Sequence, residues 1–267
     1  MKVGIVGCGT IGRRVASGLD SGEVPGVGLG ALSSRNLGQA MEFARSLGAP
    51  PPVVPMEEVP ALVDLVIEAA GQDAVEPIAQ ATLRSGKDLM VLSCGALLDR
   101  EDLLTLAGDN GASIYAPSGA IACLDGIMGA SMGHIDSLTM ISTKPPEGFK
   151  DTPGMVGSPI DLDALTEPAT LYEGPAVEAC RLFPANINVS AAVAMAGLGP
   201  HETKVRIVAD PAVVHNTHEI VVTGEFGILQ MKIQNVPSAS NPKTGMLTAL
   251  STLASLRKLV SPLKVGT

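Results

Sequence analysis

Residues 1–15, MKVGIVGCGTIGRRV, determine how the rest of this sequence is interpreted. An apolar run ends at Gly7, and a helix-like pattern begins directly after Gly9 and includes Gly12. In a dinucleotide-binding fingerprint the first glycine permits a tight turn, the second lets a pyrophosphate approach the backbone, and the third lets the helix pack closely on the sheet. The helix N–H groups then face the phosphates. The predicted cofactor-binding residues in this turn are Gly7, Gly9, Thr10, Ile11 and Gly12.

The end of the second expected strand, residues 27–33, bears on the choice between NAD and NADP. A carboxylate commonly holds the ribose 2′-OH of NAD about 20 residues after the glycines. This sequence has Ser33, Ser34 and Arg35 there instead. Hydroxyls and a guanidinium suit a 2′-phosphate, so we predict that Ser34 and Arg35 contact the cofactor and that NADP is used, alongside NAD. The alternative is that Arg35 is only a solvated loop residue.

Composition and charge set the outer limits of fold and partners. The 267 residues are 46% hydrophobic and 17% charged, enough for one large core or two modest ones. The net charge of −9 argues against nucleic acid or an anionic membrane as partners, because both favour a basic face. The apolar runs are too short to span a bilayer or to act as a signal peptide, so we expect a cytoplasmic protein.

The four cysteines show no metal-ligand spacing, and neither do the four histidines, so no metal site is predicted. In a cytoplasmic enzyme the thiols would stay reduced and serve mainly in packing. Cys94 is the one with an alternative role, because it follows the apolar run at 88–92. A catalytic thiol there would imply aldehyde oxidation, but no histidine or other base lies nearby in the sequence.

The first 120 residues alternate strand and helix patterns. Further strands are expected at 27–33, 64–70, 89–92 and 112–115, with helices at 36–47, 74–85 and 100–108 between them. This alternation predicts an α/β fold in which residues 1–120 form a Rossmann-type, doubly wound parallel sheet of five or six strands. The strand expected at 64–70 ends at Gly71, where the cofactor should pass. We therefore add Ala70 and Gly71 to the predicted cofactor-binding residues.

The pattern changes beyond residue 122. Period-two runs at 137–143, 203–209, 215–223 and 226–236, with a hairpin turn at 223–225, predict a second, α+β domain at 121–239 on a largely antiparallel sheet. Residues 240–267 are expected to form a helix from Pro242 that returns to the first domain. The second sheet carries more apolar surface than about 120 residues readily bury, which predicts a homodimer. The residues behind this prediction are Val205, Ile207, Ile220, Val222, Ile228 and Ile233.

Three segments of the second domain and tail carry chemically interesting side chains. They are Asn186 and Asn188 in 183–189, His215 and His218 in 215–219, and Lys243 and Thr244 in 235–244. Each has an ordinary explanation when taken alone, because asparagines cap helices, strand histidines fill cores and Asn-Pro forms turns.

Taken together in order, five segments resemble the L-aspartate dehydrogenase family over essentially the whole chain. They are GCGTIG at 7–12, PSGAI at 117–121, FPANINV at 183–189, NTHEI at 216–220 and NPKT at 241–244. The resemblance implies NAD(P)-linked oxidative deamination of L-aspartate to iminosuccinate and then to oxaloacetate and ammonia, together with the reverse amination. It also implies that His218 is catalytic and that the nicotinamide is contacted by Ala120, Ala122 and Asn188.

The chemistry of this reaction suits an imidazole that works near neutral pH, because one group must take a proton from the amine or from water and return it. The two substrate carboxylates need cationic or N–H donors. Basic candidates are Lys144, Arg181, Lys232 and Lys243. We favour Lys243 because the helix start expected at Thr244 adds backbone N–H groups. The predicted substrate-binding residues are Asn188, Lys243 and Thr244.

Two other functions stay open from the sequence. Dihydrodipicolinate reductases have a similar two-domain plan, but their paired histidines followed by a lysine are not matched around His215 and His218. A non-catalytic protein that senses NAD(P) and regulates a partner would keep the fold. An assay of L-aspartate-dependent NAD(P)H formation separates these functions from the dehydrogenase.

Overall fold

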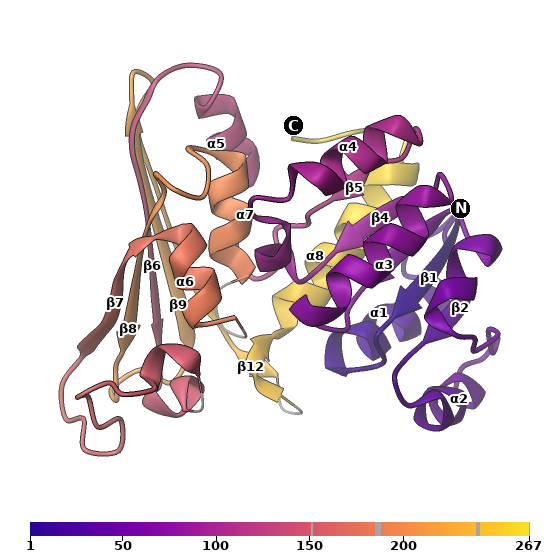
Figure 1. The fold of residues 1–267 in the computed structure, drawn as a ribbon, viewed down its shortest axis with the longest axis horizontal. Helices are drawn as coiled ribbons and strands as arrows, with labels where there is room; N and C mark the ends of the chain where they lie inside the picture. The colour runs from indigo at the N-terminus through magenta and orange to yellow at the C-terminus, as the bar shows by residue number, and fades with distance from the viewer. Residues whose placement is uncertain (151, 185–187, 239–240, 267) are drawn as a thin grey trace. The chain divides into compact units, whose positions relative to one another are not determined.

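The computed structural model describes residues 1–150, 152–184, 188–238 and 241–266, with only the backbone described at 237–238 and 241–245 (Figure 1). The chain forms two compact units. The first consists of Met1–Gly119 and Thr248–Val265, and the second is built mainly from Ala120–Leu247. The sequence placed the boundaries at 120/121 and 239/240, so the second boundary lies further along the chain than expected.

The first unit contains a five-stranded, wholly parallel sheet in the order β2-β1-β3-β4-β5. This architecture confirms the predicted doubly wound α/β fold. The order reverses between β1 and β3, which makes that point the topological switch point. The strands are β1 (Lys2–Val6), β2 (Gly28–Ser33), β3 (Leu65–Glu68), β4 (Asp88–Val91) and β5 (Ile114–Tyr115).

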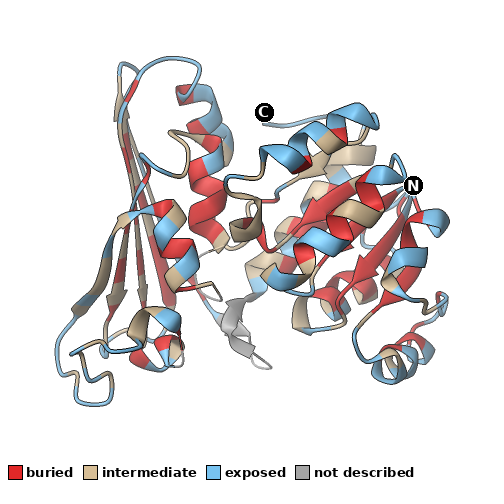
Figure 2. Ribbon diagram, viewed as in Figure 1, coloured by how far each residue is buried: buried red, intermediate tan, exposed pale blue. Residues whose placement is uncertain are grey.

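Helices cover both faces of this sheet, so every residue of β3 is buried (Figure 2). On one face, Leu65 and Ile67 pack with side chains from α1, α2 and α8. On the other, Val66 packs with α3, α4 and the 3-10 helix η1. These helices are α1 (Thr10–Asp20), α2 (Leu37–Arg45), η1 (Met56–Leu62), α3 (Gln72–Arg84), α4 (Glu101–Asp109) and α8 (Met246–Val260); the short 3-10 helix η2 (Cys94–Leu97) follows β4.

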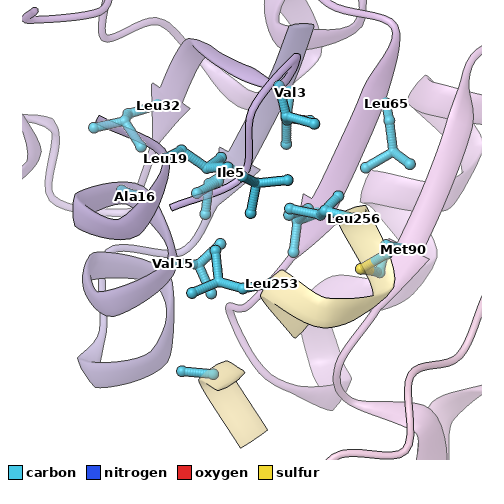
Figure 3. Packing of buried hydrophobic residues seen from close by; sticks show 14 of the residues in the cluster. Val3, Ile5, Val15, Ala16, Leu19, Leu32, Leu65, Met90, Leu253 and Leu256 are labelled. Carbon is cyan, nitrogen blue, oxygen red and sulfur yellow. The ribbon is translucent and has the colours of Figure 1, made fainter. Parts of the chain in front are cut away.

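The C-terminal helix α8 contributes to the core of the first unit. Figure 3 shows its Leu253 and Leu256 among Ile5, Val15 and Met90, and all five residues are buried. The expected helix start at Pro242 is wrong. Residues Asn241–Gly245 form a short strand, β12, which pairs with β11 (Pro237–Ser238), and the helix begins at Met246. An early proline is compatible with a helix start, but it is equally compatible with a short edge strand.

The second unit is an α+β domain on a five-stranded sheet in the order β10-β9-β6-β8-β7. Its strands are β6 (Ile135–Lys144), β7 (Ala169–Pro175), β8 (Lys204–Ala209), β9 (Asn216–Gly224) and β10 (Gly227–Asn235). The β6–β8 pair is parallel and the other three pairs are antiparallel. The sheet is thus largely antiparallel, as predicted, but mixed.

Two details of this sheet differ from expectation. The hairpin turn consists of Glu225 and Phe226 and not of residues 223–225, because Gly224 still pairs with Gly227. Gly227 has φ +111°, which glycine adopts without strain. Strand β7 was missed because it is an edge strand with a register shift between Thr170 and Tyr172, which breaks the period-two pattern.

Helices cover one face of the second sheet. They are α5 (Leu124–Ala130), α6 (Ala176–Leu182) and α7 (Asn188–Ala196), and the 3-10 helices η3 (Pro146–Phe149) and η4 (Pro153–Met155) follow β6. Val205, Ile207, Ile220 and Val222 are buried beneath α5, α6 and α7 in the core of this unit. The expectation that these residues form surplus apolar surface is therefore wrong. Across the described ranges, no helix is both long and apolar enough to cross a membrane.

Candidate active site

The glycine turn after β1 has the geometry of a dinucleotide-binding site. Gly7 has φ +115° and its N–H donates to the Ser33 carbonyl oxygen at 2.8 Å. A Cβ at Gly7 would collide with the Ala69 carbonyl, and one at Gly12 would collide with the Gly7 carbonyl oxygen, so both positions require glycine. A Cβ at Gly9 would meet no described atom within 4 Å, which leaves room in front of α1. The turn therefore fits the pyrophosphate of a dinucleotide.

Helix α1 begins at Thr10 with Gly9 as its N-cap residue and no side-chain cap. Thr10 and Ile11 are half-buried in this first turn. The first N–H groups of a helix have no intrahelical partner, and the helix dipole favours an anion beside them. These residues can thus supply the donors that the pyrophosphate needs.

The other predicted cofactor residues of the first unit lie at the carboxyl ends of its strands. Ser34 is half-buried and Arg35 exposed just after β2, and Asn36 then caps α2 by accepting the Gln39 N–H at 3.0 Å. Ala70 and Gly71 are exposed after β3, with Gly71 at φ +109°. This is the sheet edge at which open α/β folds bind their ligands.

Cys94 lies in a position that disfavours the aldehyde-oxidation alternative. The thiol is buried and donates to the Val91 carbonyl oxygen at 3.2 Å. Reactive cysteines are partly exposed and lie near groups that stabilise the thiolate. The geometry of Cys94 is that of a packing residue.

The second unit buries a polar cluster around His218. The imidazole is only 3% exposed on β9, and its Nδ1 lies 3.1 Å from the Ser142 Oγ. Ser142 and His218 are direct partners across the β6–β9 ladder. Lys144, two residues further along the same face of β6, is also buried. This cluster combines a histidine, the hydroxyl that orients it and a cation.

The surroundings shift the proton equilibrium of His218. Burial, and secondly the positive charge of Lys144, lower the pKa of His218 to about 3. In the protein without substrate His218 therefore does not titrate near neutral pH, and its role in the reaction stays a prediction. His218 is neutral in the physiological range and has a lone pair available to accept a proton.

Of the four basic candidates for the substrate carboxylates, Lys144 shares the buried cluster of His218. Arg181 is exposed on α6. Lys232 lies on the opposite face of the sheet, 2.9 Å from the Glu219 carboxylate. Lys243, which the sequence favoured, and Thr244 have side chains outside the described residues. Lys144 is thus the basic candidate that the described residues place beside His218, and the role of Lys243 stays a prediction.

The remaining predicted residues of the second unit lie in separate segments. Ala120 is half-buried and its carbonyl oxygen accepts from the Asn235 Nδ2 at 2.8 Å, while Ala122 is exposed. Asn188 is the half-buried first residue of α7, and Asn186 lies outside the described residues.

No group of three His, Cys, Asp or Glu side chains that could hold a metal ion occurs within the described ranges.

Comparisons with known proteins identify the family. Residues 125–259 match the family model of the aspartate dehydrogenase C-terminal domain, and residues 7–117 match that of the homoserine dehydrogenase NAD-binding domain. The L-aspartate dehydrogenase of Methanocella arvoryzae is 44% identical, over 100% of this chain and 99% of that protein. This chain belongs to the aspartate dehydrogenase family. The resemblance inferred from the sequence is thereby confirmed.

Further relatives agree with this membership of the aspartate dehydrogenase family. L-aspartate dehydrogenase 3 of Bordetella bronchiseptica is 44% identical, over 100% of this chain and 98% of that protein. The crystal structure of aspartate dehydrogenase from Thermotoga maritima has a TM-score of 0.74 at 28% identity and covers 100% of this chain and 99% of that one. The first unit is thus the NAD(P)-binding domain of an aspartate dehydrogenase family member.

Replacing Arg35 by alanine tests the proposed 2′-phosphate contact in this domain. A guanidinium–phosphate pair is a charged hydrogen bond, so we expect kcat/KM for NADP to fall by about tenfold relative to that for NAD. Arg45→Ala provides the control, because Arg45 is an exposed arginine in the last turn of α2. An unchanged NADP-to-NAD ratio in Arg35→Ala would reject the contact.

Proposed function

We propose that this protein catalyses the NAD(P)-dependent oxidative deamination of L-aspartate. Iminosuccinate would form first, and water would then hydrolyse its C=N bond to give oxaloacetate and ammonia; the reverse amination would use the same groups. The observation that carries this proposal is the buried His218, oriented by Ser142 and placed beside Lys144 in a chain of the aspartate dehydrogenase family. The proposed small-molecule partners are therefore L-aspartate, oxaloacetate and ammonia.

The bound NAD(P)⁺ would supply the hydride acceptor for the substrate Cα. The glycine turn and the first turn of α1 would hold its pyrophosphate. Ser34 and Arg35 would contact the adenosine ribose. Further contacts are proposed from Ala70, Gly71, Ala120, Ala122 and Asn188.

His218 would perform the proton transfers. Ser142 engages Nδ1, which leaves Nε2 as the nitrogen that exchanges a proton with the substrate amine or the attacking water. Burial and the positive charge of Lys144 make His218 a weak base in the absence of substrate. A substrate carboxylate bound to Lys144 would offset that positive charge and raise the pKa of His218 towards its ordinary range. Substrate binding would thus make His218 a stronger base, while the larger effect, that of burial, would remain.

Product analysis tests the reaction. With L-aspartate and NAD(P)⁺, we expect oxaloacetate, ammonia and NAD(P)H to form in equal amounts, and oxaloacetate with ammonia should consume NAD(P)H. Tight cofactor binding without any turnover of L-aspartate would instead favour the sensing protein.

We propose that the second unit forms a homodimer through the face of its sheet that the helices leave uncovered. This face carries β-branched residues, namely Ile141, Val208 and Val221, which are only half-buried, and Ile228, which is 69% exposed. Two ion pairs, Arg206–Glu173 and Lys232–Glu219, flank them. A sheet face with apolar and mutually paired charged residues can pack against its own copy around a two-fold axis.

Light scattering tests the dimer. We expect twice the mass of one 27.2 kDa chain at micromolar concentration. Val221→Lys, which places a charge on the uncovered face of β9, should shift the protein towards the monomer. Leu104→Lys, at an exposed position on α4, should leave the mass unchanged. A single-chain mass for the unmodified protein would refute this proposal.

We also propose that the protein works in a reducing compartment such as the cytoplasm. All four cysteines are thiols, and two of them, Cys8 and Cys123, are partly exposed. Burial raises the pKa of both of these thiols, which keeps them protonated and slow to oxidise. Partly exposed thiols persist most readily where the cell keeps cysteine reduced.

A further inference from the structure

Glu68 is a buried carboxylate that the proposed reaction does not use. It is the last residue of β3, at the carboxyl edge of the parallel sheet, and its exposure is 0%. Within the described part of the chain, no lysine, arginine or histidine forms an ion pair with it. A buried carboxylate without such a cation is costly unless hydrogen-bond donors surround it. The identity of these donors therefore indicates what Glu68 does.

Four hydrogen bonds satisfy this carboxylate, and they come from two different loops. The backbone N–H groups of Ala70 and Gly71 donate to Oε1 at 2.7 and 2.8 Å. Ser93 donates its N–H to Oε2 at 2.9 Å and its hydroxyl to Oε1 at 3.0 Å. Ala70 and Gly71 follow β3, while Ser93 follows β4, so the carboxylate of Glu68 ties together the loops after two neighbouring strands.

The loop after β3 also contacts the glycine turn of the fingerprint. An ideal Cβ at Gly7 would lie 2.7 Å from the Ala70 nitrogen and would collide with the Ala69 carbonyl. The Ala69–Ala70 peptide therefore packs directly against the turn at Gly7. The turn itself is held by backbone hydrogen bonds that do not involve Glu68, from the Gly7 N–H to the Ser33 carbonyl oxygen and from the Ala69 N–H to the Val6 carbonyl oxygen, both at 2.8 Å. Glu68 therefore acts on the loop beside the turn rather than on the turn.

The strand order shows which part of the cofactor this arrangement concerns. In a doubly wound sheet the dinucleotide crosses the switch point, which lies here between β1 and β3. Ser34 and Arg35 follow β2, on the side expected to hold the adenosine ribose. Glu68, Gly71 and Ser93 lie on the other side, at the ends of β3 and β4. The nicotinamide half of the cofactor is therefore expected to bind on this side of the switch point.

We propose that Glu68 is a positioning residue for the nicotinamide half of the cofactor. Its carboxylate holds the loops after β3 and β4 in the one arrangement that accepts this half. Without it, the loops would share their population between this and other arrangements, and apparent affinity falls by the fraction of protein in the competent state. The proposal rests on NAD(P) binding and not on the identity of the substrate.

Calorimetric titration of the full-length protein with NAD⁺ and with ADP tests this role. ADP carries the adenosine and the two phosphates but lacks the nicotinamide half. Glu68→Gln keeps the shape of the side chain and one acceptor oxygen, but it turns an NH₂ group towards a donor of Ser93. We expect the Kd for NAD⁺ to rise about tenfold or more and the Kd for ADP to stay within about twofold.

Two further variants sharpen this test. Ser93→Ala removes one hydrogen-bond donor to Glu68. It should raise the Kd for NAD⁺ by a smaller factor than Glu68→Gln does and leave the Kd for ADP unchanged, so it tests the proposal even if Glu68→Gln fails to fold. Asp20→Asn is the matched control, because Asp20 accepts the N–H groups of Gly48 and Ala49 at 2.7 and 2.9 Å near the opposite end of α1. It should leave both Kd values unchanged. Equal weakening of NAD⁺ and ADP binding by Glu68→Gln, or no weakening of either, would overturn the proposal.

Discussion

Replacing His218 by alanine should lower kcat by about 10²- to 10⁴-fold and leave the Kd for NAD(P)⁺ unchanged. The reason is that His218 belongs to the second unit, whereas the fingerprint turn lies in the first. His218→Gln should disturb folding less than His218→Ala, because it nearly preserves the side-chain volume and keeps a polar atom for Ser142. Steady-state kinetics with L-aspartate and direct titration with the cofactor measure the two quantities separately.

Two controls separate catalysis from packing at this position. Ser142→Ala removes the orienting hydroxyl and should reduce kcat less than loss of the imidazole does. The pH profile of kcat/KM reports the free enzyme, so a pKa of about 3 for His218 predicts that this profile has no inflection from His218 between about pH 5 and 8. Parallel losses of kcat and of cofactor affinity in the His218 variants would show that the residue is structural.

L-Aspartate should be preferred over L-alanine by roughly 30- to several-thousand-fold in kcat/KM. Alanine lacks the second carboxylate. The buried cation that pairs with this carboxylate in aspartate would therefore have no partner in bound alanine. L-Glutamate should also react poorly, because its extra methylene displaces Cα when both carboxylates are held. Initial rates with the three amino acids at matched cofactor concentration measure this preference.

The preference for aspartate should depend on Lys144. Lys144→Met keeps much of the side-chain length without the charge and should raise the KM for L-aspartate, so that the advantage over L-alanine largely disappears. Lys232→Met is the matched control, because Lys232 pairs with Glu219 on the opposite face of the same sheet. Similar kcat/KM values for aspartate, alanine and glutamate in the unmodified protein would refute a site that binds both carboxylates.

The fold of the first unit could be predicted from local patterns. The glycine spacing around Gly7 requires a specific turn, and a parallel sheet covered on both faces gives continuous apolar runs such as that of β3. Glu68 was overlooked within that run. A charged residue at the end of an otherwise buried strand was the signal. Two of its four donors come from Ser93, 25 residues away, and the local pattern does not show that contact.

The site in the second unit could be predicted only in part. Alternation places Ser142 and Lys144 on the inner face of their strand, and the family segment singled out His218. What the sequence lacks is the register that pairs Ser142 with His218, and therefore the proximity of Lys144 that shifts the pKa of His218. The sequence also does not show that α5, α6 and α7 pack on this face, which is why the buried Val205 and Ile220 were expected at a dimer interface.

The most direct test of the account is the absorbance of reduced nicotinamide after L-aspartate is added to the purified protein with NAD⁺ or NADP⁺. The account predicts NAD(P)H formation that requires L-aspartate and rises in proportion to the protein concentration. It would be contradicted if bound cofactor stayed oxidised with L-aspartate. It would also be contradicted if NAD(P)H were consumed only with a cyclic imine such as dihydrodipicolinate.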